Sequence, residues 1–129
     1  MCRAVVVLCM IHLNTRNSYQ NSERGTSIMS NAVFFNSYKL RDGASVPDFL
    51  LAVEKLMEGH ISKQEGYVSF KLLAEGDAWA DYVMFETVDH LNAFLEASQN
   101  DSNELAEKFY SFLDFDTCKT HIYSVEKSF

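Results

Sequence analysis

The chain has 129 residues, of which 11 are Lys or Arg and 18 are Asp or Glu, so its formal charge at pH 7 is -7. This length suits one domain with a single hydrophobic core, and the negative charge argues against a nucleic-acid partner, whose phosphates need a basic surface. The three cysteines are an odd number without metal-ligand spacing, which favours a reducing, cytoplasmic location and indicates no metal site.

The first 28 residues differ in character from the rest of the chain. An apolar run of eight residues, 4–11, precedes an almost wholly polar stretch over 14–27. Eight apolar residues are too few to span a bilayer, which takes about 20, and no small-residue cleavage site follows them. We therefore expect residues 1–28 to be a disordered N-terminal extension, residues 29–129 to form the domain, and no membrane to be involved.

The domain opens with a strand and then a helix. Residues 32–39 are rich in aromatic and β-branched side chains, which predicts a strand. Ser45 then offers a helix cap, and Pro47 falls in the first turn, where its missing N–H costs nothing. Apolar residues follow at the spacing of one buried helical face: Val46, Phe49, Leu50, Val53, Leu56, Met57 and Ile61.

Two further strand-like runs, 67–73 and 78–86, are separated by a short turn at Gly76 and Asp77. A short turn of this composition between apolar runs is typical of an antiparallel hairpin. The next change, after Thr87, is to helical spacing.

The remaining chain predicts two helices and a last strand. Asp101 and Glu104 resemble a capping box that would open the second of these helices, and its buried stripe is expected to continue to Leu113. Residues 117–125 then form the closing strand. The predicted order is β-α-β-β-α-α-β, a split βαβ fold of the α+β class with two right-handed crossovers onto one four-stranded antiparallel sheet.

The predicted strands do not alternate between apolar and polar residues, as a sheet with one wet face should. Phe34 and Tyr38 oppose Val33 and Phe35 in the first strand, and both sides of the run 78–86 are apolar too. The helices can cover only one face, and the bare face would exceed the few hundred Å² of apolar patch usual for monomers. We therefore expect an obligate homodimer in which two copies of the sheet pack face to face.

A family resemblance appears in the text Phe85-Glu86-Thr87, which leads into Leu91-Asn92-Ala93-Phe94-Leu95. With this patterning the chain from about Met29 to Phe129 resembles the dimeric α+β barrel proteins of the antibiotic biosynthesis monooxygenase type. The resemblance implies a ferredoxin-like subunit and a substrate pocket between helices and sheet. Its members include cofactor-independent oxygenases that convert polycyclic phenols to quinones, and haem-degrading enzymes.

The haem-degrading branch of this family uses an Asn on the first strand, a Trp on the second long helix and a His shortly after it. Asn36 matches the first position, but Phe94 stands where the Trp would be and no His lies between Leu95 and Phe115. Because the residue that would ligate haem iron is absent, the resemblance implies no haem and no other cofactor.

Strand alternation counted from Asn36 predicts which side chains line the pocket. A carboxamide and two phenols in an apolar chamber can hold and polarise a phenolic or carbonyl oxygen. Trp79 falls on the face expected at the dimer interface. The predicted substrate-binding residues, beside Asn36 as a catalytic residue, are Phe34, Tyr38, Tyr82, Met84 and Phe94. The alternative for Asn36 is a buried amide with a purely structural role.

An oxygenase without a cofactor needs a base to form the electron-rich anion of its substrate. His121, on the last strand, is the histidine expected to approach the interior of the sheet, so it is the candidate base, with a hydrogen-bonded core imidazole as the alternative. His60 falls near the end of the first helix and His90 in the first turn of the second, where neither needs a chemical role.

Two hypotheses of different classes follow. The first is a cofactor-independent monooxygenase that acts on a small aromatic or quinone-like molecule. The second is a non-catalytic homodimeric barrel that binds a small apolar ligand or a protein partner. The fold hosts many unrelated activities, so the resemblance does not choose between them. A cavity of about 300 Å³ or more would favour a ligand.

Overall fold

Four strands form one antiparallel sheet in the order β2-β3-β1-β4. The computed structural model describes residues 30–100 and 103–129 of the chain. The elements are β1 (Ala32–Leu40), α2 (Val46–Gly59), the short 3-10 helix η2 (Ile61–Lys63), β2 (Tyr67–Glu75), β3 (Ala78–Phe85), α3 (Val88–Asn100), α4 (Glu104–Tyr110) and β4 (Leu113–Ser124). This order and sheet confirm the predicted fold class. The predicted extension over residues 1–28 lies outside the described residues.

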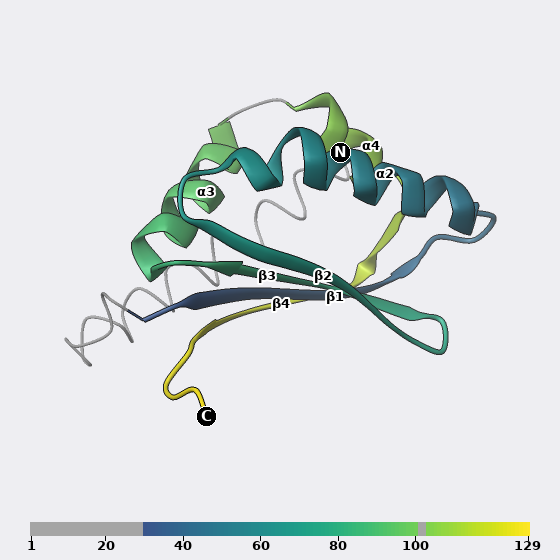
Figure 1. The fold of residues 1–129 in the computed structure, drawn as a ribbon. Coiled ribbons are helices and arrows are strands. Elements are labelled where there is room, and N and C mark those ends of the chain that lie inside the picture. Colours follow the sequence, from purple (N-terminus) through teal and green to yellow (C-terminus); the bar gives the residue numbers. More distant parts are fainter. Residues whose placement is uncertain (1–29, 101–102) are drawn as a thin grey trace.

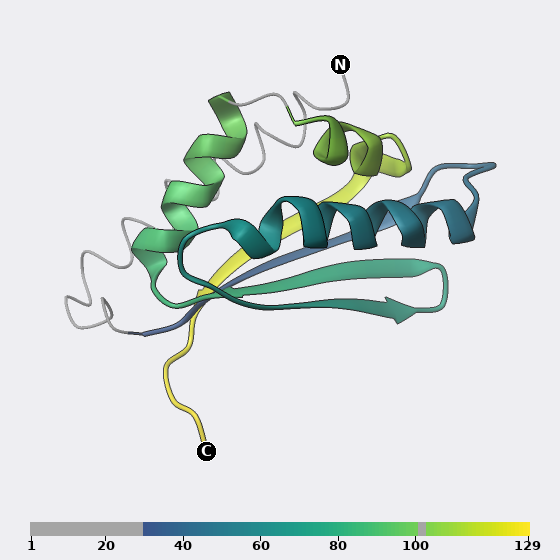
Figure 2. The same ribbon diagram turned by 45° about the horizontal axis from the view of Figure 1, so that its top comes forward.

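The helices α2, α3 and α4 all lie on one face of the sheet (Figure 1 and Figure 2). Strand β1 continues through α2 to β2, and β3 lies between these two parallel strands. Strand β3 continues through α3 and α4 to β4 in the same way, with β1 between them. One helix layer therefore packs on what we call the inner face of the sheet. No described element covers the other face, which we call the outer face (Figure 1).

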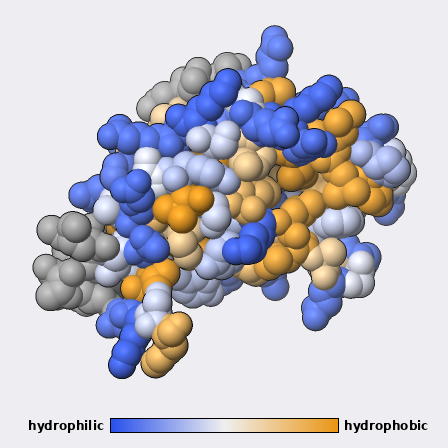
Figure 3. All heavy atoms as spheres, viewed as in Figure 1, coloured by the Kyte–Doolittle hydropathy of each residue, from blue (hydrophilic) through white to orange (hydrophobic). Residues whose placement is uncertain are grey.

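Helix α2 begins as the sequence predicts, since the Ser45 hydroxyl accepts the Asp48 N–H at 3.4 Å and a proline stands in the first turn. Its buried residues are Phe49, Ala52, Val53 and Leu56. The predicted inclusion of Val46 and Leu50 in the buried stripe is wrong, because each is 42% exposed. In Figure 3 hydrophobic side chains gather where α2 crosses the sheet. No helix of the described residues has the length and apolar character to span a membrane.

Helix α4 has a different cap from the predicted one. The Asn103 side chain accepts the N–H groups of Leu105 and Ala106, at 2.9 and 3.1 Å. Asp101, the predicted cap, lies outside the described residues. The helix packs closely against α2, because a Cβ added at Gly59 would lie only 2.7 Å from the Leu105 Cδ1 atom. The absent side chain of Gly59 therefore leaves room for Leu105 between these two helices.

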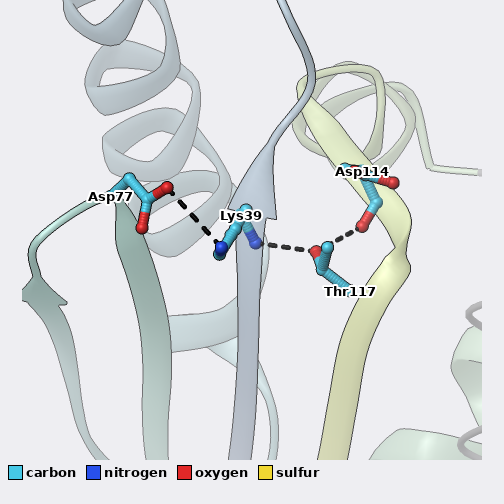
Figure 4. A network of polar contacts seen from close by, with 4 residues as sticks. All are labelled: Lys39, Asp77, Asp114 and Thr117. Atoms are coloured by element: carbon cyan, nitrogen blue, oxygen red, sulfur yellow. Dashed lines mark hydrogen bonds and ion pairs between the residues drawn. The ribbon is translucent and has the colours of Figure 1, made fainter.

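The last strand begins earlier than predicted, at Leu113, and this residue belongs to the strand and not to the preceding helix. The pairing of β1 with β4 shifts register between Ser37 and Lys39. At this irregularity the Thr117 hydroxyl accepts the Lys39 N–H at 2.9 Å and donates to the Asp114 carbonyl at 2.6 Å (Figure 4). The bulge keeps a polar stretch within the strand, which is why its sequence resembles a loop.

The hydrophobic core fills the space between the helix layer and the inner face. Strands β1 and β3 supply its floor, with side chains that are at most 4% exposed: Ala32, Phe34, Tyr38, Val83 and Phe85. Phe49 of α2 is fully buried over them. Leu91 and Leu95, both fully buried, complete the layer from α3. These apolar contacts hold the helices at a fixed height over the centre of the sheet, where the polar residues described next are found.

Candidate functional site

A cavity of about 130 Å³ lies between the helix layer and the inner face. Apolar side chains from the sheet and from all three helices form much of its wall: Phe34, Leu56, Phe70, Val83, Phe94 and Phe109. Asn36 and Asp81 add polar groups from the sheet. The volume is below the roughly 300 Å³ of common ligand pockets, but close to the roughly 150 Å³ of an engineered apolar cavity that binds benzene. The cavity therefore has room for about one aromatic ring.

Asn36 lies in the middle of β1 on the inner face and is 2% exposed. It pairs with Asp81 of β3 on one side and with Thr120 of β4 on the other. The Thr120 hydroxyl donates to Asn36 Oδ1 at 2.9 Å, and the Asn36 side chain also hydrogen-bonds the Asp81 carboxylate. The amide is thus oriented by its two neighbouring strands, with its nitrogen directed to the carboxylate.

Asp81 is a carboxyl group buried in the middle of the sheet, where it is 5% exposed. Burial raises the pKa of Asp81 to about 7, against an ordinary value of 3.8, and the hydrogen bonds from Tyr38 and Asn36 offset part of this rise. The loss of hydration is the largest cause, because the charged form loses most when water is removed. Asp81 therefore changes its charge near neutral pH, on the wall of a cavity.

Tyr38 shares the inner face with Asn36, as predicted, but it lies in the core and does not line the cavity. Its hydroxyl donates to Asp81 Oδ1 at 2.7 Å, and its ring packs on Phe49 and Phe109. Burial raises the pKa of Tyr38, and the neighbouring charge of Asp81 raises it further. Tyr38 is therefore a neutral phenol that fixes the carboxylate by hydrogen bonding.

The helix side of the cavity carries a second polar group, His60, at the end of α2. Its Nδ1 atom lies 3.4 Å from Gln64 Nε2 and 3.3 Å from Asn103 Nδ2. Both amide nitrogens are donors, so an unprotonated Nδ1 can accept a hydrogen bond from either of them. The ring also packs against Phe94 at 6.2 Å between centroids. His60 thus lines the cavity, a position that the sequence analysis did not predict.

The structure brings together Phe34, Asn36 and Phe94 at the cavity, but it places Tyr82 and Met84 on the outer face. Their predicted position in the pocket is wrong. Alternation along β3 correctly separates these two from their neighbours, but it cannot say which set faces the helices. The pairing of Asn36 with Asp81 decides this, because directly paired residues project to the same side of a sheet.

Two other aromatic residues were also predicted on the wrong face of the sheet. Trp79 pairs with Tyr38 on the inner face and packs against Phe49 at 5.1 Å, so its predicted place at the dimer interface is wrong. His121 pairs with Phe35 on the outer face, where it is exposed and stacks on Tyr123. It does not reach the cavity, so its predicted approach to the interior is wrong as well.

Asp81 is the functional candidate that sequence reasoning missed, although one signal points to it. Strand β3 ends at Phe85 and α3 begins three residues later, at Val88. An apolar side chain so close to a helix start is well placed to face the helix layer. Every second residue of a strand lies on the same side, so counting back from Phe85 in steps of two puts Val83 and Asp81 on the inner face. Among residues 30–100 and 103–129, no group of three His, Cys, Asp or Glu side chains could hold a metal ion.

Comparison with known proteins gives matches in structure. No family model and no curated protein matches the sequence. SnoaB, a cofactor-independent oxygenase from Streptomyces nogalater, superposes with a TM-score of 0.60 at 13% identity, over 77% of this chain and 96% of its own. A Caulobacter crescentus protein provisionally assigned to the antibiotic biosynthesis monooxygenases gives 0.61 at 7% identity, over 82% and 99%.

A third match is a dimeric Bacteroides fragilis protein of unknown function and ferredoxin-like fold. It superposes with a TM-score of 0.52 at 14% identity, over 74% of this chain and 96% of its own. Likeness at such low identities is a likeness of fold. The chain therefore has the ferredoxin-like α+β fold of the antibiotic biosynthesis monooxygenase-type structures.

Proposed function

We propose that this protein is a cofactor-independent monooxygenase of the antibiotic biosynthesis monooxygenase type that oxidises a small aromatic molecule with a phenolic hydroxyl. In the reaction of a phenol to a quinone, one oxygen atom of O₂ enters the ring, the other leaves as water, and the substrate itself supplies all the electrons. The observation that carries this proposal is the oriented Asn36 amide beside Asp81, on the wall of a ring-sized cavity. The fold of SnoaB supports it.

The chemistry assigned to Asn36 is that of a polar anchor. A fixed amide can hold the phenolic oxygen of the substrate at the sheet and stabilise the charge that develops on it. The apolar wall excludes water around the ring and so strengthens this interaction. The cavity volume of about 130 Å³ favours a substrate of one ring over a polycyclic one.

Truncation of the Asn36 side chain is expected to lower turnover strongly. Asn36→Ala should lower the rate of oxygen uptake with a reactive phenol about 100-fold or more, which is the usual loss for one donor to a developing oxyanion. Oxygen-electrode measurements across a panel of single-ring phenols test this. Thr120→Val is the matched control, because it removes the same Asn36 hydrogen bond without removing a cavity-lining group, and it should cost much less. Equal losses in the two variants would contradict an anchoring role.

The second candidate is a non-catalytic homodimeric barrel that binds a small apolar ligand. The modest cavity volume favours it, because the space is smaller than that of most substrate pockets. Absence of oxygen uptake by the unmodified protein with every phenol tested, together with saturable binding of a ring-sized ligand, would support this candidate and exclude the first.

We also propose that two copies pair through their outer faces. Phe35, Tyr82 and Met84 lie there on the central strands and are only partly buried, and Tyr123 is 55% exposed. Pairing of two sheets would remove this apolar surface from water. The Bacteroides fragilis protein of this fold is a dimer, which supports the proposal.

Light scattering after size exclusion is expected to give twice the chain mass of 14.7 kDa at micromolar concentration. Phe35→Asp would place a charge in the centre of the interface and should raise the dissociation constant of the dimer about 100-fold or more. Leu50→Asp, at a position of α2 that is 42% exposed, is the matched control and should leave the dimer intact. A monomeric unmodified protein under these conditions would refute the pairing.

A further inference from the structure

We propose that Asp81 accepts the proton of an acidic aromatic hydroxyl bound in the cavity, so that the site selects phenols over ethers and hydrocarbons of the same shape. This inference deepens the proposed function and rests on the same cavity. It concerns which ligand binds and where its proton goes, and both can be measured without any oxidation.

The first argument is the position of the carboxylate. Asp81 is 5% exposed, and it lines the cavity together with Asn36. Its protein partners, the Tyr38 hydroxyl and the Asn36 amide, are neutral hydrogen-bond donors. A carboxylate has lone pairs for about four hydrogen bonds, so one more donor from a ligand can be accommodated.

The second argument is the charge of the cavity. Among the residues that the structure describes, no lysine or arginine lines it. An anionic ligand, such as a carboxylate or a phosphate, would meet an uncompensated negative charge in apolar surroundings and be repelled. A neutral ligand with an O–H group instead donates to that charge. The ligand class is therefore a neutral, ring-sized hydroxyarene.

The third argument is the match in acidity. An Asp with its ordinary pKa is a base about a million times weaker than a phenolate, whose parent phenol has a pKa near 10. A carboxyl that titrates near neutral pH is a far stronger base and is matched to phenols acidified by an electron-withdrawing group. In the transfer the ligand O–H bond breaks and a new O–H bond forms on Asp81. The products are an aryloxide and a neutral carboxyl group.

Other ionisable groups near Asp81 must be separated from it in any pH experiment. Tyr38 of β1 contacts it directly, and burial keeps this phenol neutral. His60 at the end of α2 and Tyr110 of α4 line the same cavity. The residue opposite Asp81 on β2 is Leu72, which does not ionise. His60 is thus the other side chain of this cavity whose contribution the experiment must separate from that of Asp81.

The test compares 4-nitrophenol with its methyl ether, 4-nitroanisole, in calorimetric titrations from pH 5 to 9. The unmodified protein should bind the phenol about 10- to 100-fold more tightly than the ether at pH 7, and the preference should fall towards pH 5 as Asp81 is protonated. Asp81→Asn should bind the two within about threefold of each other. The absorbance of the nitrophenolate reports where the proton lies in the complex.

Two further variants keep the test decisive if Asp81→Asn does not fold. Tyr38→Phe removes one hydrogen bond to the carboxylate. The fall in phenol affinity towards low pH, which we call the acid limb, should therefore move up by about one to two pH units. His60→Gln should leave the midpoint of that limb in place. Equal binding of phenol and ether by the unmodified protein, or an acid limb that follows His60, would overturn the inference. Phenol selectivity without oxygen uptake would leave it standing and refute only the oxygenase proposal.

Discussion

Asp81→Asn is expected to raise the free energy of unfolding more at pH 8 than at pH 5. The gain of the variant over the unmodified protein should be larger at pH 8 by about 3 kcal/mol. The reason is the buried charge of Asp81, whose pKa is raised by burial from 3.8 to about 7. Asparagine has nearly the same shape but no charge to bury. Urea unfolding at both pH values, at a fixed protein concentration, measures the difference.

The sign follows from the proton balance of folding. Between pH 3.8 and about 7 the folded chain holds a proton on Asp81 that the unfolded chain has lost. The stability that belongs to this proton is complete below the unfolded pKa and is lost as the pH rises through the folded pKa. The unmodified protein should therefore weaken across this window, whereas the asparagine variant lacks this dependence.

Asp77 provides the matched control for this experiment. It lies in the β2–β3 turn with its side chain 81% exposed, and it pairs with Lys39 at 3.6 Å (Figure 4). An exposed ion pair contributes little, so Asp77→Asn should change stability to a similar small extent at pH 5 and pH 8. A flat difference between Asp81→Asn and the unmodified protein would mean that Asp81 is not a buried carboxylate with a raised pKa.

The fold could be predicted from the sequence because its signals are local and agree with each other. The cap at Ser45, the turn at Gly76 and the change to helical spacing at Thr87 each mark a boundary within a few residues of its place in the structure. The start of β4 could not be found in this way. It depends on a register shift against β1, supported by Thr117, which the linear pattern does not contain.

The candidate site was predicted only in part, for a related reason. Asn36 and Phe34 belong to one strand, where alternation fixes their common side. Tyr82 and Met84 belong to another strand, and the face on which they lie depends on the pairing register between the two strands. A carboxylate such as Asp81 is usually expected to face water, so its residue type alone predicts an exposed position and not the buried one that it has. Its burial is compensated by donors on another strand, which only the three-dimensional pairing brings together.

Phe49→Ala is expected to destabilise the protein by about 3–5 kcal/mol, the usual cost of removing a buried aromatic ring from a core. Phe49 is fully buried, and its ring contacts four other rings that join α2 to the rest of the domain. The centroid distances are 6.1 Å to Tyr38, 5.1 Å to Trp79, 6.1 Å to Phe109 and 6.1 Å to Phe112. Thermal or urea unfolding, monitored by circular dichroism, measures the loss.

The neighbouring Leu50→Ala is the matched control, because it lies on the same helix but is 42% exposed, and it should cost less than about 1 kcal/mol. The Phe49 variant should also disturb the site, since its ring supports Tyr38, which in turn holds Asp81. Loss of the Tyr38 hydrogen bond removes a group that lowers the Asp81 pKa, so the acid limb of phenol binding should move to higher pH. A large loss of stability with an unmoved limb would show that the carboxylate is held independently of the aromatic core.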